Sequence, residues 1–186
     1  MTPTVESCRP GELSAADRRR CDALSERVWP AAMRRSIRPE FASAPAPTEH
    51  WPDAQQPRLF LLRRDGVIVA KAKVFPRRIT TEEGPLVVAA LAGVLCDPDR
   101  RGCGYGKAVV RAAFGLVDDG TFGCAFFQTG VAEFYEKLGC RVVTNRLVNS
   151  LAVTPSARPF WDEAAMIYPA GFAWPSGEID TLGPGW

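Results

Sequence analysis

The spacing of apolar and polar positions first predicts a helix near the start of the chain. Ser14 followed by Asp17 resembles an N-cap with an acidic first turn, and apolar residues then recur at helical spacing up to Pro30. We therefore expect this helix to be the first element. Residues 31–57 contain five prolines, which predict a loop with short helical pieces.

The next segment has the pattern of strands. Two apolar runs, at 59–62 and 67–70, flank Asp65-Gly66, and this dipeptide suits the positive φ values of a tight hairpin turn. A second turn is expected over residues 80–85, and the almost uncharged run 86–96 suits a central strand. Together these runs predict a three-stranded antiparallel meander.

After residue 106 helices and strands alternate. Apolar positions recur at helical spacing from Gly106 until Gly120, which predicts a helix directly after a glycine-rich loop. A strand at 123–127, a helix at 131–138 and a further strand or hairpin within 142–153 are expected to follow. The tail, residues 164–186, is rich in Pro and Gly, but its tryptophans and Ile179 provide apolar anchors.

Composition narrows the class of protein. A chain of 186 residues with 46% apolar content suits one domain, residues 1–186. The net charge is only +2, which favours neither nucleic acid nor a membrane as a partner, and no apolar run approaches the roughly 20 residues of a membrane span. We expect a cytoplasmic protein. The six cysteines form no C-x-x-C pair and His50 is the single histidine, so we expect reduced thiols and no metal site.

The chemistry is expected at the glycine-rich loop. Residues 94–107 read as a strand, a turn and the entry into a helix. Glycines let the backbone approach a ligand closely, and the free amides and dipole of a helix N-terminus attract a phosphate. Arg101 and Lys107 add full positive charges. The segment therefore predicts an anion site.

Two other phosphate loops fit poorly. A Walker loop requires Gly in place of Arg101 and Ser or Thr in place of Ala108. The dinucleotide fingerprint requires G-x-G-x-x-G, whereas residues 102–106 have G-x-G-x-G and no suitably placed acidic partner follows. A plain structural turn remains as the alternative.

Two motifs resemble the GCN5-related N-acetyltransferase (GNAT) family. Arg101-x-x-Gly104-x-Gly106 is similar to the pyrophosphate-binding motif of that family, and the strand at 93–96 resembles the strand that pairs with the pantetheine arm. The run Phe134-Tyr135-Glu136-Lys137-Leu138-Gly139-Cys140 resembles the second family signature. The resemblance covers about residues 86–143 and implies an α/β fold, with a mixed, mainly antiparallel central sheet flanked by helices on both faces.

The resemblance also implies roles for residues. Acetyl-CoA is the expected co-substrate, with pantetheine contacted by Val94, Leu95 and Cys96, and with the pyrophosphate held by the amides of Arg101, Gly102, Cys103, Gly104, Tyr105 and Gly106, beside Lys107. Tyr135 is expected to face the thioester sulfur. A tyrosine hydroxyl, of ordinary pKa near 10, can donate a hydrogen bond or proton to a leaving thiolate. Alternatively, the Tyr135 ring only packs in the core.

The general base is not evident from the sequence. The attacking amine must be neutral, and a carboxylate, imidazole or water chain usually takes its proton. Some family members carry a glutamate on the strand before the loop, where this chain has Ala89-Ala90-Leu91-Ala92. The remaining candidates are Glu40, His50, Asp53, Glu82, Glu83 and the acidic residues of the tail. Each could equally be an exposed surface residue.

The tail resembles two branches of the family more loosely. Residues 174–180 and the final Gly185-Trp186 are similar to segments of aminoglycoside 2'-N-acetyltransferases and of nodulation N-acyltransferases, which implies an aminosugar acceptor. Asp180 and the terminal carboxylate of Trp186 would attract a cationic amine, and Trp174 would stack on a sugar face. Alternatively, the tail covers an edge strand.

The expected function is N-acetyl transfer from acetyl-CoA to a primary amine of a small molecule, by direct attack on the thioester. A longer acyl donor, on CoA or a carrier protein, is a second reading. A binding module that senses acyl-CoA without turnover is a third. Whether two chains pair as a homodimer is left open.

Overall fold

The computed structural model describes residues 4–30, 49–153 and 159–186. Within these residues the strands are β1 (Val5–Cys8), β2 (Arg58–Arg64), β3 (Val67–Thr81), β4 (Gly84–Cys96), β5 (Ala125–Thr129), β6 (Arg141–Val143), β7 (Leu147–Val148), β8 (Ala164–Tyr168) and β9 (Ile179–Asp180). The α-helices are α1 (Ala15–Val28), α3 (Tyr105–Asp118) and α4 (Ala132–Glu136). Short 3₁₀ turns are formed by Pro10–Glu12, Asp53–Gln55 and Pro98–Arg100.

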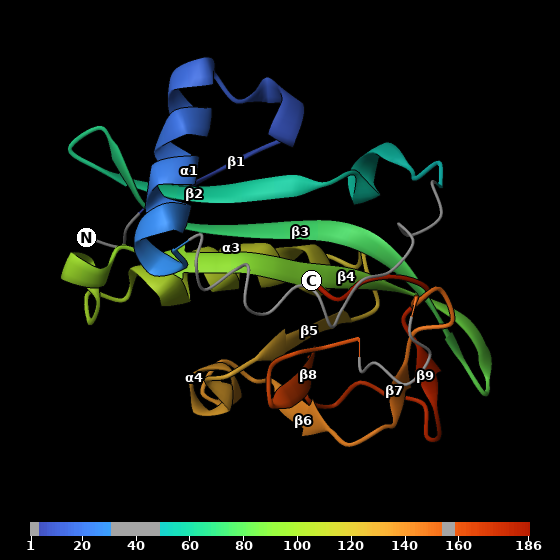
Figure 1. Ribbon diagram of the computed structural model, residues 1–186. Helices are drawn as coiled ribbons and strands as arrows, with labels where there is room; N and C mark the ends of the chain where they lie inside the picture. Colours follow the sequence, from blue (N-terminus) through green and yellow to red (C-terminus); the bar gives the residue numbers. More distant parts are fainter. Residues whose placement is uncertain (1–3, 31–48, 154–158) are drawn as a thin grey trace.

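The strands form one mixed sheet in the order β1-β2-β3-β4-β5-β8-β6, and β9 pairs with both β3 and β7 (Figure 1). All neighbours are antiparallel except β4 with β5 and β7 with β9. The chain reaches β5 from β4 through α3, because a parallel partner needs a crossover connection. This is the α/β, mainly antiparallel fold expected from the sequence.

The predicted meander is confirmed, with one shorter turn. Asp65 and Gly66 both have positive φ, as the two-residue hairpin between β2 and β3 requires. Between β3 and β4 the turn is only Glu82-Glu83, since Thr81 already pairs with Gly84. The strands therefore extend further than the polar residues around this turn suggested.

The first helix forms as predicted but is not the first element. Ser14 caps α1, and its side-chain oxygen accepts a hydrogen bond from the Asp17 amide at 3.0 Å. The four-residue strand β1 precedes it and pairs with β2 at the edge of the sheet. A strand this short carries little periodicity of its own, so the prediction that the chain starts with a helix was wrong.

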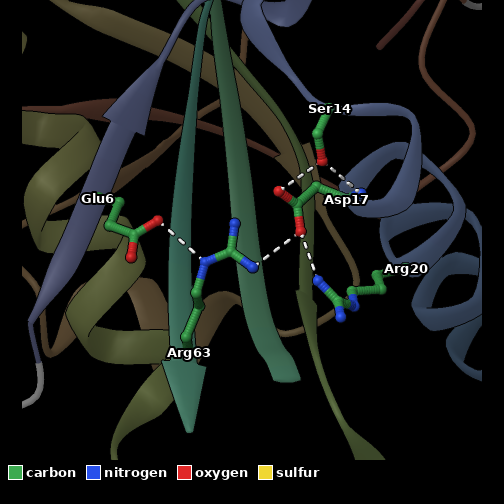
Figure 2. A network of polar contacts seen from close by, with 5 residues as sticks. All are labelled: Glu6, Ser14, Asp17, Arg20 and Arg63. Atoms are coloured by element: carbon green, nitrogen blue, oxygen red, sulfur yellow. Dashed lines mark hydrogen bonds and ion pairs between the residues drawn. The ribbon is translucent and has the colours of Figure 1, made fainter. Parts of the chain in front are cut away.

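A polar network joins α1 to the edge strands (Figure 2). Arg63 of β2 donates to Asp17 of α1 at 2.8 Å and to Glu6 of β1 at 3.0 Å. Asp17 also accepts from Arg20 and Ser14. These bonds lower the pKa of Asp17, with Arg63 the largest cause, and raise the pKa of Arg63.

Helices cover both faces of the sheet, as expected (Figure 1). Alternate residues of β2 point to opposite faces, so Phe60 and Leu62 pack in the cluster that contains the apolar side of α3, whereas Leu59 and Leu61 pack in the cluster of α1. Burial of a large side chain such as Phe114 of α3 contributes about 2 kcal/mol.

Pairing in the last third of the chain differs from expectation. Residues 142–153 do not form a hairpin, because β6 pairs with β8 and β7 pairs with β9. The tail adds β9 to the end of β3, where Thr80 pairs with Asp180 and Thr81 with Ile179. All six cysteines are free thiols, as predicted.

Candidate active site

The site is built where two adjacent parallel strands part. β4 and β5 are paired only at Ala89 with Ala125 and at Ala90 with Phe126. Beyond that point β4 continues to Cys96 with β3 on its other side, so its edge toward β5 is left without a strand partner among the described residues. The backbone N–H and C=O groups of this edge need other partners.

A bulge in β4 explains the parting of the strands. Lys71 of β3 pairs with Leu95, but Lys73 pairs with Ala92, so β4 holds one extra residue in this interval. Gly93 lies there with φ of 56°, a left-handed value that favours glycine. A bulge bends and twists its strand, which here accompanies the separation of β4 from β5.

A cavity of about 520 Å³ occupies the space between the parted strands. Both strands contribute to its wall, together with the end of α1, the glycine-rich loop, α4 and the tail. The lining residues are Val28, Trp29, Leu91, Ala92, Gly93, Val94, Cys96, Arg101, Phe127, Gln128, Thr129, Gly130, Val131, Tyr135, Trp161, Asp162 and Trp186. The wall is mainly apolar, with a few polar groups.

The glycine-rich loop has the geometry of an anion cradle at one end of this cavity. Gly104 is the N-cap of α3, with φ of 77°, and a Cβ placed there or on Gly102 would meet no atom within 4 Å. Among the described residues, the amides from 101 to 105 and that of Lys107 donate no hydrogen bond to protein, while the Gly106 amide faces the Cys96 thiol. Free amides at a helix start are a site for phosphate.

Charged and aromatic side chains surround the loop. Arg101 and Lys107 are exposed, so both are free to approach a ligand. The Tyr105 side chain points to β2, where its hydroxyl accepts a hydrogen bond from Arg64 at 3.2 Å and its ring lies 5.4 Å from the Arg64 guanidinium carbon. Arg101 and Lys107 of the loop and Arg64 of β2 therefore bring positive charge to the region of the first turn of α3.

Tyr135 of α4 lines the cavity and is buried, with 5% of its surface exposed. Its ring lies 4.6 Å from that of Phe127 and 4.9 Å from that of Phe134. Burial raises the pKa of the hydroxyl, with smaller contributions from Cys140 and Asp162. The group thus remains protonated at neutral pH, able to donate a hydrogen bond into the cavity.

The sequence matches the family model of the acetyltransferase (GNAT) domain over residues 13–143. The chain belongs to the GNAT family. Membership identifies it as an acyltransferase that takes its acyl group from coenzyme A. No curated protein matches the chain.

Solved structures show the same GNAT fold at low sequence identity. An Escherichia coli GNAT family N-acetyltransferase, YhbS, solved in complex with CoA, is 13% identical with a TM-score of 0.59, over 96% of this chain and 89% of that one. Escherichia coli ElaA is 15% identical with a TM-score of 0.56, over 89% and 99%. A GCN5-related N-acetyltransferase from Kribbella flavida is 15% identical with a TM-score of 0.53, over 76% of this chain, which spans only 34% of that protein.

The GNAT strand residues predicted to contact pantetheine divide between two sides. Val94 and Cys96 line the cavity. The Leu95 side chain points away, because neighbours along a strand alternate, and it packs with α1 in the core. Leu95 therefore contributes its backbone, and not its side chain, to the open edge of β4.

Asp162 is a cavity residue that sequence analysis missed. It lies just before β8, whose first residue Ala164 pairs with Thr129 at the end of β5. Burial raises the pKa of its carboxyl, with a further contribution from Glu163. The Gln128 side chain accepts the amides of Trp161 and Asp162 at 2.8 and 2.9 Å, which fixes the backbone there. The apolar run at 164–168 indicates a strand next to Asp162, but the sequence does not show that this strand pairs with β5.

The expected base candidates lie elsewhere. Glu40 lies outside the described residues, and neither His50 nor Asp53 lines the cavity. Asp53 forms an exposed ion pair with Arg9 at 3.5 Å. Glu82 and Glu83 form the turn between β3 and β4, away from the cavity. None of the described members of that set is placed to reach an acceptor there.

The three tail residues predicted to bind substrate are not brought together. Trp186 lines the cavity, whereas Trp174 packs 4.8 Å from the Phe126 ring, donates to Asn145 and borders a separate cavity of about 700 Å³. The Asp180 carboxylate accepts the amides of Ser150 and Leu182. It therefore has a structural task within the tail.

Neither a metal-binding cluster nor a membrane-spanning helix is found among the described residues. No group of three or more His, Cys, Asp or Glu side chains in this part of the chain could hold a metal ion. Its helices are all too short or too polar to cross a membrane.

Proposed function

We propose that this chain is an N-acetyltransferase that transfers an acetyl group from acetyl-CoA to a primary amine of a small molecule, and that the cavity between β4 and β5 is its active site. One observation carries the proposal: Arg101, the first residue of the loop whose amides are uncommitted, and Tyr135 line the same cavity. The cavity joins an anion site to a hydrogen-bond donor, as a thioester of CoA requires.

The loop and β4 fit the CoA portion. The amides from Arg101 to Tyr105 would hold the diphosphate, with Arg101 and Lys107 supplying charge-assisted contacts; the Gly106 amide, which was also predicted to do so, faces the Cys96 thiol instead. The open space at Gly102 and Gly104 leaves room for the close approach of phosphate oxygens. The free edge of β4 from 91 to 96 would pair with the amide groups of the pantetheine arm, beside Val94 and Cys96.

Bound acetyl-CoA supplies an acetyl thioester. Asp162 takes a proton from the incoming ammonium, which leaves a neutral amine able to attack the thioester carbonyl carbon. The Tyr135 hydroxyl donates a hydrogen bond to the sulfur as the C–S bond breaks. In the balance of the reaction the nitrogen loses two protons: Asp162 passes the first to solvent, and the second ends on the CoA sulfur, while a C–N bond replaces the C–S bond.

Asp162 is the base that this cavity best supports. It is a carboxylate that lines the same cavity as Tyr135, and a base with a raised pKa is better matched to an ammonium group. The Tyr135 hydroxyl serves as a hydrogen-bond donor rather than a free acid, because its raised pKa disfavours full ionisation.

One tail residue bears on the class of the acceptor. Trp186 is the one member of the predicted set of Trp174, Asp180 and Trp186 that lines this cavity. An aminosugar therefore stays one acceptor class to be tested, supported by a single indole that could lie against a sugar face.

A thiol-release assay tests the proposal. Purified protein is incubated with acetyl-CoA or octanoyl-CoA and with one amine at a time: glucosamine, kanamycin, ethanolamine or tyramine. Free CoA thiol is measured, together with the acylated product by mass spectrometry. Product with at least one amine supports the proposal. Turnover only with octanoyl-CoA would support the longer donor instead. Tight acetyl-CoA binding by calorimetry, without product from any of these pairs, would support a non-catalytic binding module.

A further inference from the structure

A buried arginine holds the end of the chain. Arg77 of β3 is only 8% exposed, and it donates to the carbonyl of Thr181 at 3.0 Å and to that of Pro184 at 3.3 Å. Its guanidinium carbon lies 5.2 Å from the centre of the Trp186 ring. In Figure 1 the tail runs back from β9 toward the middle of the sheet, where the end marked C lies.

The environment of Arg77 makes these contacts costly to lose. No carboxylate of the described residues is within ion-pair distance of it. Burial lowers the pKa of its guanidinium, which reflects the penalty for a charge removed from water. The tail carbonyls and the indole face partly replace that water, so the arginine and the tail depend on each other.

The same tail places Trp186 in the wall of the cavity. The indole N–H donates to the Phe126 carbonyl at 3.1 Å, and the ring packs 5.0 Å from Phe160. Gln128 donates to the main-chain oxygen of Trp186 at 2.9 Å, through the same side chain that fixes the backbone of Asp162. Trp186 thus contacts β5 and the site from one side and Arg77 from the other.

We propose that Arg77 is a positioning residue for the acceptor: it holds residues 181–184 so that the Trp186 indole forms a wall of the cavity and limits the size of the amine that enters. This inference rests on the proposed function, because it assigns the acceptor to that cavity. Arg77 is not among the residues that line the cavity and acts only through the tail.

Asn145 provides a matched control. Its side chain donates to the carbonyls of Pro175 and Gly177 at 3.0 and 2.8 Å, and it accepts the indole N–H of Trp174 at 2.7 Å. From the link between β6 and β7 it therefore tethers the tail with three hydrogen bonds, compared with two from Arg77. The cavity that it borders is the separate one.

The positioning role is tested first without activity. The chain has five tryptophans, so a ¹⁵N–¹H spectrum of the labelled protein resolves their indole N–H signals, which Trp186→Phe and Trp174→Phe assign. In Arg77→Gln we expect the Trp186 signal to shift and to exchange with solvent at least tenfold faster, while that of Trp174 is unchanged. Arg77→Lys should retain part of the protection. Asn145→Ala should show the reverse pattern.

The selectivity role is tested by kinetics with ethanolamine and tyramine as acceptors. In Arg77→Gln the preference in kcat/KM for ethanolamine over tyramine should fall about tenfold, with KM for acetyl-CoA unchanged within about twofold. Trp186→Leu should give the same fall, and the double variant no more than either, because both act on one wall. Asn145→Ala should lower Tm without changing the preference.

The outcomes separate the two proposals. A protected Trp186 signal in folded Arg77→Gln, or an unchanged amine preference in Trp186→Leu, overturns the inference. If Arg77→Gln does not fold, Arg77→Lys and Trp186→Leu still decide it. Absence of acetyl-CoA turnover by the parent protein counts against the proposed function, and the indole spectra then decide whether Arg77 holds Trp186.

Discussion

Ala90 of β4 pairs with Phe126 of β5, and one residue further along, Leu91 and Phe127 already line the cavity. Two parallel strands thus pass from a closed ladder to an open site within a single residue step. The bulge at Gly93 lies just beyond this point, in β4. This separation turns backbone groups of β4 from sheet partners into possible ligand partners.

Removal of the Tyr135 hydroxyl should affect turnover and not donor binding. In Tyr135→Phe we expect kcat to fall about a hundredfold, because a positioned donor to the leaving sulfur is lost. The ring contacts with Phe127 and Phe134 remain, so the dissociation constant for acetyl-CoA should stay within about twofold. Steady-state kinetics and calorimetry measure the two quantities.

Tyr168 is the control for this change. Its hydroxyl donates to Asp118 at 2.7 Å and lies outside the cavity lining. Tyr168→Phe should lower the free energy of unfolding by about 1 kcal/mol and leave kcat unchanged. Equal kcat in Tyr135→Phe and the parent protein would remove Tyr135 from the mechanism.

Asp162 should determine the acid limb of the pH profile. Because burial raises its pKa, the carboxyl stays protonated to a higher pH than the ordinary value near 3.9, and kcat/KM should rise with pH through that raised pKa. Asp162→Asn should abolish this limb and lower the plateau about a hundredfold. Glu163→Gln removes a neighbouring negative charge, so it should move the limb to lower pH and keep the plateau.

The raised pKa of Asp162 also affects the stability of the protein. A raised folded pKa means that the native protein binds this proton more tightly, so its contribution is lost as pH rises from about 3.9 through the folded value. Asp162→Asn should therefore be at least as stable as the parent at pH 7. A lower Tm at that pH would indicate a structural role for the carboxylate.

Gly104→Ala should weaken donor binding. The substitution strains a left-handed residue, at a cost of about 1 kcal/mol in stability, and directs a methyl group into the space proposed for the diphosphate. Gly120→Ala is the matched control at the other end of α3, with φ of 82° and similarly open surroundings. Both should lower Tm, but only Gly104→Ala should raise the dissociation constant of acetyl-CoA, by about tenfold or more. Equal affinities of the two variants for acetyl-CoA would show that the diphosphate binds away from Gly104.

Asp17 should make the free energy of unfolding depend on pH in the acidic range. Its folded pKa is lowered by Arg63, Arg20 and Ser14, so its contribution is present above the unfolded value near 3.9 and is lost as pH falls through the folded pKa. Asp17→Asn should lower Tm at pH 7 by several degrees, and the difference should shrink toward pH 2. Asp22→Asn, on the exposed side of α1, should change Tm little at either pH. If the difference in Tm between Asp17→Asn and the parent protein did not change with pH, the ionised Asp17 carboxylate would not contribute to stability.

Several features followed from the sequence because their causes are local. The Ser14 cap, the Asp65-Gly66 turn and the entry into α3 at Gly104 each depend on residues within four positions of one another. Local backbone rules act over that distance, so spacing alone could predict these elements. The motif around Tyr135 was found in the same way.

Long-range pairing decided the rest. Asp162 comes to the cavity because β8 runs antiparallel to β5, and Trp186 does so because Arg77, more than a hundred residues earlier, binds the tail. Trp174 and Asp180, equally promising by residue type, are committed to Asn145 and to backbone amides. Residue type and spacing determined which groups could serve the chemistry, but strand pairing and burial, which join distant segments, selected those that reach the cavity.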